Sequence, residues 1–234
     1  MLPYFFRHYD PIVDRYFISD NGSTDRSREL LAGNRKVALG EFRIPRTSFV
    51  EAATDHYNHC WKQSRGIADW VIVVNVDEHV YHPDLRSYLQ ACTRNGVSIL
   101  LPEGYNMVAD QWPTSRKPLW KTVQHGMRDP IWDKPQVFDP NRIGEINFKE
   151  GRHSASPTGE VVFPRTERTR LLHYKYLGGN YLSSRHAELR ARFPAADFAR
   201  GWGYQYLWDE QETSAELARV RAAAVRVVQP GKAG

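Results

Sequence analysis

The stretch WVIVVNVDEH, from Trp70 to His79, decides the fold. It begins with an uninterrupted apolar run, Trp70 to Val74, and it ends in a polar cluster. An apolar run without alternation is typical of a strand covered on both faces, as in a parallel α/β sheet. Polar groups just past the carboxyl end of such a strand lie where open α/β sheets bind their ligands. The stretch therefore predicts a buried central strand with a ligand site at its end.

The polar cluster has the composition of a cation site. Asn75, Asp77 and Glu78 place oxygen atoms at one strand end, and oxygen ligands suit hard divalent cations such as Mg²⁺ or Mn²⁺. A cation held there could also bind a diphosphate. Acidic residues are equally common in turns that close a strand, so this stretch alone leaves both interpretations open.

Composition sets wide limits. The chain has 234 residues, of which 41% are hydrophobic and 25% charged, which is ordinary for a globular protein with one sizeable core or two small lobes. The net charge of +5 favours anionic partners such as nucleotides, nucleic acid or an anionic membrane face. An ordinary basic surface explains the same charge. No block of like charge resembles a nucleic-acid-binding arm, so nucleic acid is not an expected partner.

The cysteines and the apolar segments indicate a cytoplasmic protein. Cys60 and Cys92 lie in predicted helices and form no CxxC pair, which is typical of reduced thiols. No apolar run is long enough to span a membrane. The first ten residues, MLPYFFRHYD, are too few and too polar for a signal peptide.

A second polar turn precedes the central stretch. A predicted strand, Arg15–Ser19, leads into DNGSTD, which begins at Asp20, and a helix follows through Leu31. Gly22 permits a tight turn, and Ser23 or Thr24 is the expected helix cap. A strand, a small polar turn and a helix N-terminus form a natural anion or nucleotide cradle. A well-capped turn without a ligand is the alternative.

Alternation of strands and helices from residue 15 to residue 102 predicts a doubly wound α/β unit with right-handed crossovers. Beyond residue 102 the pattern becomes loop-rich and then helical, and long loops inside compact domains are usually functional. The remaining predicted elements are helices over 2–9, 48–66 (with a Ser48/Glu51 capping box), 83–93, 181–193 and 212–228, strands over 36–42, 97–101, 136–138 and 171–174, and a loop-rich segment over 103–135.

The order of these features resembles the inverting glycosyltransferases of family 2 with the GT-A fold, in the bacterial branch whose second motif reads DxDEF. The segments LLPEGYNMVAD, KPQVFDP, GRH and LLHYKYL are similar to that branch, so the resemblance runs from Leu2 to about Phe193. It implies one GT-A-like domain over 1–234, with a doubly wound mixed sheet flanked by helices. Residues 1–102 would form the nucleotide-sugar half, 103–193 the loop-rich acceptor half and 194–234 a C-terminal helical extension.

The resemblance also implies roles for the two polar turns. Asp20 would contact the base or ribose of the nucleotide, with Asn21, Gly22 and Ser23 shaping that pocket. Asp77 would be the main metal ligand, and Glu78 keeps its place in the motif. Asn75 replaces the first aspartate, so it offers a carbonyl oxygen without charge. His79 replaces the usual phenylalanine.

Later residues complete the implied site. His173 or His153 would add a metal or phosphate contact, although His173 is equally typical of a buried core histidine. Arg152 and Lys175, together with Arg185, could neutralise the diphosphate. A carboxylate in the acceptor half would be the general base. Asp110 is favoured, and the other candidates are Glu103, Asp129 and Asp133.

In this family a further strand precedes the helix over 2–9, whereas this sequence opens at Met1. The resemblance therefore implies that the chain is truncated, that its start is misassigned or that the strand is replaced by other means, since loss of the strand would leave unpaired backbone groups on its neighbours.

The expected function is transfer of a sugar, with inversion, from a nucleotide-diphosphate sugar, expected to be UDP-linked, to a hydroxyl of a glycan or lipid-linked acceptor. The expected cofactor is Mn²⁺ or Mg²⁺, and the expected setting is bacterial surface polysaccharide synthesis. Peripheral contact with the inner membrane would come from the basic surface and aromatic residues. These residues are Tyr174, Tyr176, Tyr181, Trp202, Tyr204, Tyr206 and Trp208.

Two other functions remain open. A GT-A-like chain without turnover would bind a nucleotide sugar or a glycan. A nucleic-acid-binding protein is suggested by charge alone and predicts salt-dependent binding to any strand.

Overall fold

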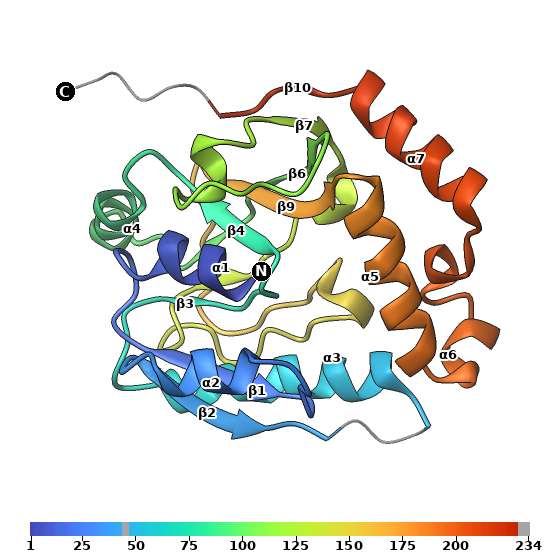
Figure 1. Ribbon diagram of the computed structural model, residues 1–234. Coiled ribbons are helices and arrows are strands. Elements are labelled where there is room, and N and C mark those ends of the chain that lie inside the picture. The colour runs from blue at the N-terminus through green and yellow to red at the C-terminus, as the bar shows by residue number, and fades with distance from the viewer. Residues whose placement is uncertain (44–46, 229–234) are drawn as a thin grey trace.

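The computed structural model, which describes residues 1–43 and 47–228, consists of three β-sheets flanked by helices (Figure 1). The predicted mixed α/β architecture is confirmed. Across the three sheets, the strand orders are β1–β2, β10–β7–β6–β9–β4 and β3–β8–β5. The helices are α1 (Leu2–Tyr9), α2 (Ser27–Ala32), α3 (Phe49–His59), α4 (Leu85–Arg94), α5 (Gly179–Arg192), α6 (Ala195–Ala199) and α7 (Glu210–Ala222).

The first sheet and its connecting helix form a parallel β–α–β unit. β1 (Tyr16–Asp20) pairs in parallel with β2 (Val37–Glu41), and α2 connects them as predicted. Gly22 has a positive φ of 68°, which agrees with the tight turn expected there. The predicted cap is wrong, because α2 begins after Arg26 and neither Ser23 nor Thr24 caps it.

The central apolar run forms a shorter strand than predicted. Within Trp70–Val74, only Val71–Ile72 (β3) are in a ladder, and they pair antiparallel with β8 (Val137–Phe138). The parallel pairing expected on this side is wrong, because the partner strand returns directly from a loop rather than through a crossover helix. β5 (Ile99–Leu100) pairs with the other edge of β8, also antiparallel.

The five-stranded sheet contains segments that the sequence pattern missed. β9 (Arg170–Leu177) is longer than predicted and lies between β4 (Glu78–Tyr81), which is antiparallel to it, and β6 (Glu103–Ala109), which is parallel. The segment expected to be loop-rich supplies both β6 and β7 (His125–Arg128). The last helix ends at Ala222, and the chain continues into β10 (Val225–Arg226), so Val228 lies outside the helix that was predicted to include it.

The N-terminus of α3 is fixed from a distant part of the chain. The Ser48 hydroxyl accepts from the Glu51 N–H, which is half of the predicted capping box. The other half is absent among these residues, because the Glu51 carboxylate pairs with Arg200 at 2.6 Å. Instead the fully buried Asp197 of α6 accepts from the Ser48 hydroxyl at 2.6 Å and from the Phe49 N–H at 2.7 Å. A carboxylate at a helix N-terminus is stabilising, and here it also joins α6 to α3.

β1 and β3 present backbone edges that no ladder occupies in the described residues. Tyr16 donates to Lys36, so in a parallel ladder the N–H groups of Phe17 and Ser19 point away from β2. Val73 donates to Gln136, so those of Ile72 and Val74 point away from β8. A cavity of about 2230 Å³ is lined by residues of both strands. In Figure 1, β1, β2 and α2 lie below this region and the five-stranded sheet above it.

Helix α1 links the two sides through side chains. Its Phe5 and Tyr9 form a buried cluster with Tyr16 of β1, and Ile72 and Val74 of the central run pack against the same cluster. Hydrophobic contacts thus hold β1 beside β3 without a backbone ladder between them.

Candidate functional site

The cavity brings both polar turns to one place. Asp20, Asn21 and Ser23 of the first turn line it, and so do Asn75 and Asp77 of the second. Gly22 and Glu78 are not among the lining residues. Both turns follow strands whose ends meet at this cavity, so one ligand in the cavity could contact both turns.

Asp20 shapes its own turn. It is buried, its two carboxylate oxygens lie 3.2 and 3.3 Å from the Ser23 nitrogen, and Arg28 donates to it at 2.9 Å. The hydrogen bonds from Ser23 and the charge of Arg28 lower the pKa of Asp20, so the group is ionised at neutral pH. Asp20 Oδ1 accepts from Ser23 alone among the described residues, so it keeps a lone pair for a ligand beside Asn21 and Ser23 in the cavity.

Asp77 is the carboxylate of the second turn that remains open to the cavity. Its side chain is 24% exposed. Burial, followed by the neighbouring charge of Glu78, raises its pKa, so a cation placed here would relieve an unfavourable negative charge. Asn75 is exposed, and its side-chain oxygen accepts from the Tyr57 hydroxyl at 2.7 Å. That oxygen has a second lone pair for a ligand.

Glu78 has a different position from the one expected of a metal ligand. It is completely buried, with one oxygen 2.8 Å from Lys134 Nζ and the other 2.8 Å from Arg152 Nη2. Burial alone would raise the pKa of Glu78, but Arg152 and Lys134 hold it well below its usual range. Both oxygens are thus committed to cations of the protein itself. The backbone N–H of Asn75 also donates to Glu78 at 3.1 Å, so the buried ion cluster fixes the turn that carries Asp77.

His173 lies opposite Asp77. Its Nε2 is 3.8 Å from Asp77 Oδ2, and its Nδ1 is 2.9 Å from Asn106 Oδ1. The indole of Trp132 covers the imidazole with ring centroids 3.7 Å apart. Burial holds the pKa of His173 well below its ordinary value, so the ring is neutral at pH 7. A neutral imidazole and a carboxylate that face each other across the cavity are a competent ligand pair for Mn²⁺.

A divalent cation therefore fits Asp77 and His173, with substrate oxygens or water completing its coordination. Within 1–43 and 47–228 no cluster of three or more His, Cys, Asp or Glu side chains is arranged to hold a metal ion. His153 lines the same cavity but is exposed, and its Nδ1 bonds to the Ile131 carbonyl at 2.9 Å.

The cationic residues of the cavity differ in how available they are. Arg152 is buried and bonds to Glu78, to the Gln136 side chain and to the Val73 carbonyl. Lys175 also lines the cavity, and burial lowers its pKa. No carboxylate of the described chain lies within ion-pair distance of Lys175, so its ammonium is free to meet an anion. Arg185, on α5, is exposed at the cavity, where it also pairs with Glu188 at 3.3 Å.

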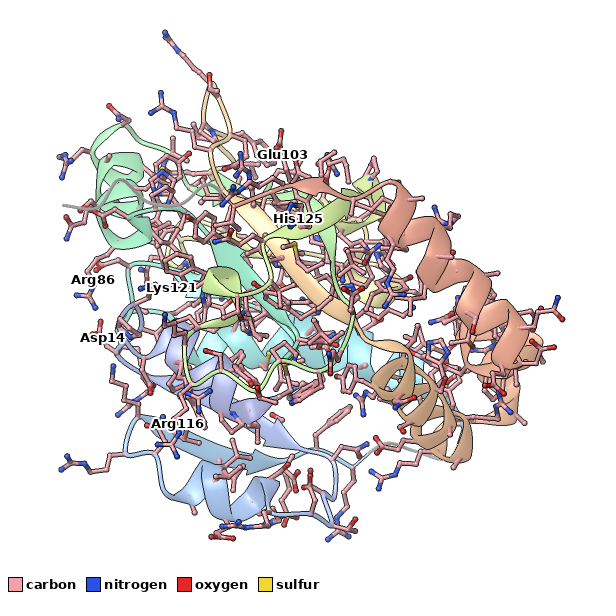
Figure 2. All side chains as sticks on the ribbon, turned by 45° about the horizontal axis from the view of Figure 1, so that its top comes forward. Asp14, Arg86, Glu103, Arg116, Lys121 and His125 are labelled. Atoms are coloured by element: carbon pink, nitrogen blue, oxygen red, sulfur yellow. The ribbon has the colours of Figure 1, made fainter. Side chains whose placement is uncertain are left out.

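The four candidate bases lie in different environments. Asp133 does not line the cavity, and it pairs with Arg128 at 2.6 Å and accepts from the Gly104 N–H at 2.7 Å. Asp110, the favoured candidate, is 90% exposed, pairs with Arg221 at 3.3 Å and does not line the cavity. Glu103 is exposed where β6 begins, beside the first residue of β9 and so at the far end of that strand from α5 (Figure 2). Asp129 does line the cavity, and its Oδ2 accepts from Asn106 at 2.8 Å. The geometry thus favours Asp129 as the base, because Asp110 and Glu103 lie at the surface and do not line the cavity.

Several residues of the site gave little sign of their role in the sequence. Lys134, Asn106, Trp132 and Tyr57 all contact the residues predicted for the site. The sequence offered a signal for Asn106 alone, because an uncharged polar residue inside the strand pattern YNMVA is unusual at a buried position. The partners of Lys134 and Tyr57 are far from them along the chain, so no local pattern could reveal them.

The aromatic residues proposed for membrane contact differ in their burial. Tyr174 and Tyr176 are 0% and 4% exposed, so they cannot contribute to a membrane-facing surface as proposed from the sequence. Six of the seven aromatic residues line the cavity, namely Tyr176, Tyr181, Trp202, Tyr204, Tyr206 and Trp208. No described helix combines the length and the apolar character required to cross a membrane.

Comparisons with known proteins add a remote structural likeness. No family model matches the chain, and no curated protein matches it. The crystal structure of S. aureus TarS is similar over 94% of this chain and 39% of the TarS chain, with a TM-score of 0.42 and 13% sequence identity. This chain therefore spans well under half the length of TarS.

Proposed function

We propose that this protein is a glycosyltransferase that moves a sugar from a nucleotide-diphosphate sugar, with UDP as the nucleotide, to a hydroxyl of a glycan or lipid-linked acceptor. The observation that carries the proposal is the single cavity lined by both polar turns, in which Asp77 Oδ2 and His173 Nε2 lie 3.8 Å apart. The ordered motifs support the same chemistry. The proposed setting is bacterial surface polysaccharide synthesis on the cytoplasmic side of the membrane.

The donor would lie across the two turns. Asn21 and Ser23 would contact the base and ribose, and Lys175 with Arg185 would meet the diphosphate. Asp77 and His173 would hold a divalent cation, which would supply positive charge to the diphosphate as it leaves. Each of these residues lines the cavity, except that Asn21 and Arg185 do so from its exposed rim.

Asp129 would be the general base. In a direct displacement, the acceptor oxygen forms a bond to the anomeric carbon while the bond from that carbon to the phosphate oxygen breaks, so the configuration inverts. The hydroxyl proton passes to a carboxylate within hydrogen-bonding reach. Asp129 keeps lone pairs for this role, because Asn106 and the Ile131 N–H use only one on each oxygen.

Thermal unfolding with a panel of nucleoside diphosphates, with and without Mn²⁺, tests the proposal. A ligand at about 100 times its Kd stabilises the folded state by about 2.7 kcal/mol, which is readily measured. We expect UDP with Mn²⁺ to raise the melting temperature, and Asp77→Ala to remove the metal-dependent part. Asp110→Ala is the matched control because Asp110 lies outside the cavity. No shift with any nucleotide would refute the proposal.

The base assignment has its own test. Asp129→Asn should abolish sugar transfer while leaving the metal-independent part of the UDP-dependent stabilisation in place, whereas Asp110→Ala should retain transfer. Loss of transfer in Asp110→Ala with full activity in Asp129→Asn would reverse the assignment.

A binding protein without turnover is the second candidate. It is favoured by Asn75, whose uncharged amide oxygen already accepts from Tyr57 and leaves Asp77 as the one open carboxylate of the turn. Asp77→Ala separates the two functions: turnover by an enzyme would be lost, while nucleotide or glycan binding by a metal-independent binder would change little.

A further inference from the structure

Four side chains from separate segments lie in a row that ends at the candidate cation site. Asn106 of β6 and His173 of β9 are directly paired in the parallel ladder, so their side chains lie on one face of the sheet. Asp129 follows β7, and Asp77 precedes β4. Asp129 Oδ2 is 2.8 Å from Asn106 Nδ2, Asn106 Oδ1 is 2.9 Å from His173 Nδ1, and His173 Nε2 is 3.8 Å from Asp77 Oδ2.

The direction of these hydrogen bonds follows from Asp129. An ionised carboxylate can only accept, so the amide group of Asn106 must turn its NH₂ toward Asp129. Its carbonyl oxygen then faces His173 and can only accept in turn. His173 must therefore carry its proton on Nδ1. Asn106 is 3% exposed, so water has little access to replace either bond.

The opposite ring nitrogen is left with a lone pair. In a neutral imidazole with a proton on Nδ1, Nε2 can only accept. It faces a carboxylate oxygen at 3.8 Å, which is beyond hydrogen-bonding distance and leaves room between two electron-rich atoms for a cation. The other tautomer would place a proton on Nε2, which would take the place of the lone pair and point toward Asp77, leaving no ligand atom for a cation there. Stacking against Trp132 holds the ring in place.

We infer that Asn106 is the positioning residue of the candidate cation site: oriented by Asp129, it holds His173 in the tautomer whose Nε2 lone pair faces Asp77. The identity of the bound ion as a divalent cation rests on the proposed function. Partners of this kind behind a metal-binding histidine typically change metal affinity by about 10–100-fold when they are removed.

The tautomer can be measured in metal-free protein by long-range ¹H–¹⁵N correlation of the histidine rings at pH 8. The chain carries two internal references. His153 Nδ1 bonds to the Ile131 carbonyl and must be protonated there, whereas His8 Nε2 bonds to the Val80 carbonyl and must have the opposite tautomer. We expect His173 to match His153 in the wild-type protein.

Two variants then separate positioning from general disruption. Asn106→Leu removes both hydrogen bonds, so His173 should shift toward the proton on Nε2, and Mn²⁺ affinity measured by calorimetry should fall about 10–100-fold. Asp129→Asn preserves the shape and removes the group that fixes the amide direction, so His173 should show a mixture of tautomers. The matched control is Asn95→Leu, because Asn95 is exposed at the end of α4 and outside the cavity.

A wild-type His173 with its proton on Nε2 would overturn the inference. So would an unchanged tautomer and unchanged Mn²⁺ affinity in Asn106→Leu and Asp129→Asn. The ring measurement needs neither nucleotide nor acceptor. Absence of sugar transfer would therefore count against the proposed function alone, while transfer by a protein with the other tautomer would count against this inference alone.

Discussion

Replacing Glu78 with glutamine should destabilise the protein strongly, because this carboxylate neutralises two buried cations. Lys134 and Arg152 both lie 2.8 Å from it, and their side chains are 2% and 1% exposed. The cluster carries one negative and two positive charges, so its net charge is +1. Glu78→Gln raises that to +2 and leaves both cations uncompensated. Removing one partner from a buried pair costs about 3–5 kcal/mol.

Replacing Lys134 with methionine makes the opposite change in charge. Lys134→Met lowers the net charge of the cluster to zero, because Glu78 still pairs with Arg152. We expect a smaller loss, about 1–3 kcal/mol, from the lost hydrogen bond and altered packing. The double variant Glu78→Gln/Lys134→Met should be more stable than Glu78→Gln alone, because it removes one of the two uncompensated cations.

Urea unfolding at pH 7, followed by tryptophan fluorescence, measures these differences, and calorimetry gives the melting temperatures. For a protein of this size, about 1 kcal/mol corresponds to about 2–4 °C, so Glu78→Gln should lower the melting temperature by about 6–20 °C. Equal losses in the two single variants would refute the reasoning. So would a double variant less stable than Glu78→Gln.

Three further predictions concern pH and the link between α6 and α3. Burial lowers the pKa of Lys134 to about 8 from 10.5, so between these pH values the unfolded chain binds more protons than the folded one. Wild-type stability should therefore rise with pH relative to that of Lys134→Met, and an equal change in urea midpoint for both proteins between pH 7.5 and 9.5 would contradict this. Burial likewise lowers the pKa of His8 to about 4 from 6.5, so stability should fall as pH drops from 6.5 towards 4, and His8→Gln should flatten the acid limb of the unfolding curve; an unchanged limb would exclude His8 as its source. Asp197→Ala should cost about 1–3 kcal/mol and speed hydrogen exchange at the first turn of α3, because the Ser48 hydroxyl and Phe49 N–H lose their acceptor; unaltered exchange there would show that Asp197 is dispensable.

Local patterns predicted the helices and the first β–α–β unit well. Most of the helices and the turn at Gly22 depend on residues close together in sequence, and the structure has them near the predicted ranges, except that α6 was not predicted and α7 ends at Ala222. The register of the five-stranded sheet could not be predicted in the same way. β6 is covered on both edges by strands from residues 125–128 and 170–177, and its own sequence does not specify those partners.

The candidate site was predictable to the same extent. Asp20 and Asp77 follow strands, and a polar residue at a strand end is visible in sequence. Glu78 follows Asp77 directly and looks equally suited to bind a ligand, yet Lys134 and Arg152 occupy both of its oxygens. Which of two adjacent carboxylates faces the cavity is decided by residues more than fifty positions away. Asp110 illustrates the same limit, because only the fold shows that it lies at the surface.

The open edges of β1 and β3 influence which parts of the molecule can open locally. Strands joined by a ladder tend to open together, whereas layers joined by side chains can separate at lower cost. The β1–α2–β2 layer contacts the central run through the aromatic cluster of α1, so it is a candidate for opening as one unit. The turn at Asp20 belongs to this layer and Asp77 to the other. A nucleotide that contacted both turns would hold the two layers together. Its binding should therefore slow amide hydrogen exchange across β1 and β2, and not only at the residues that contact it.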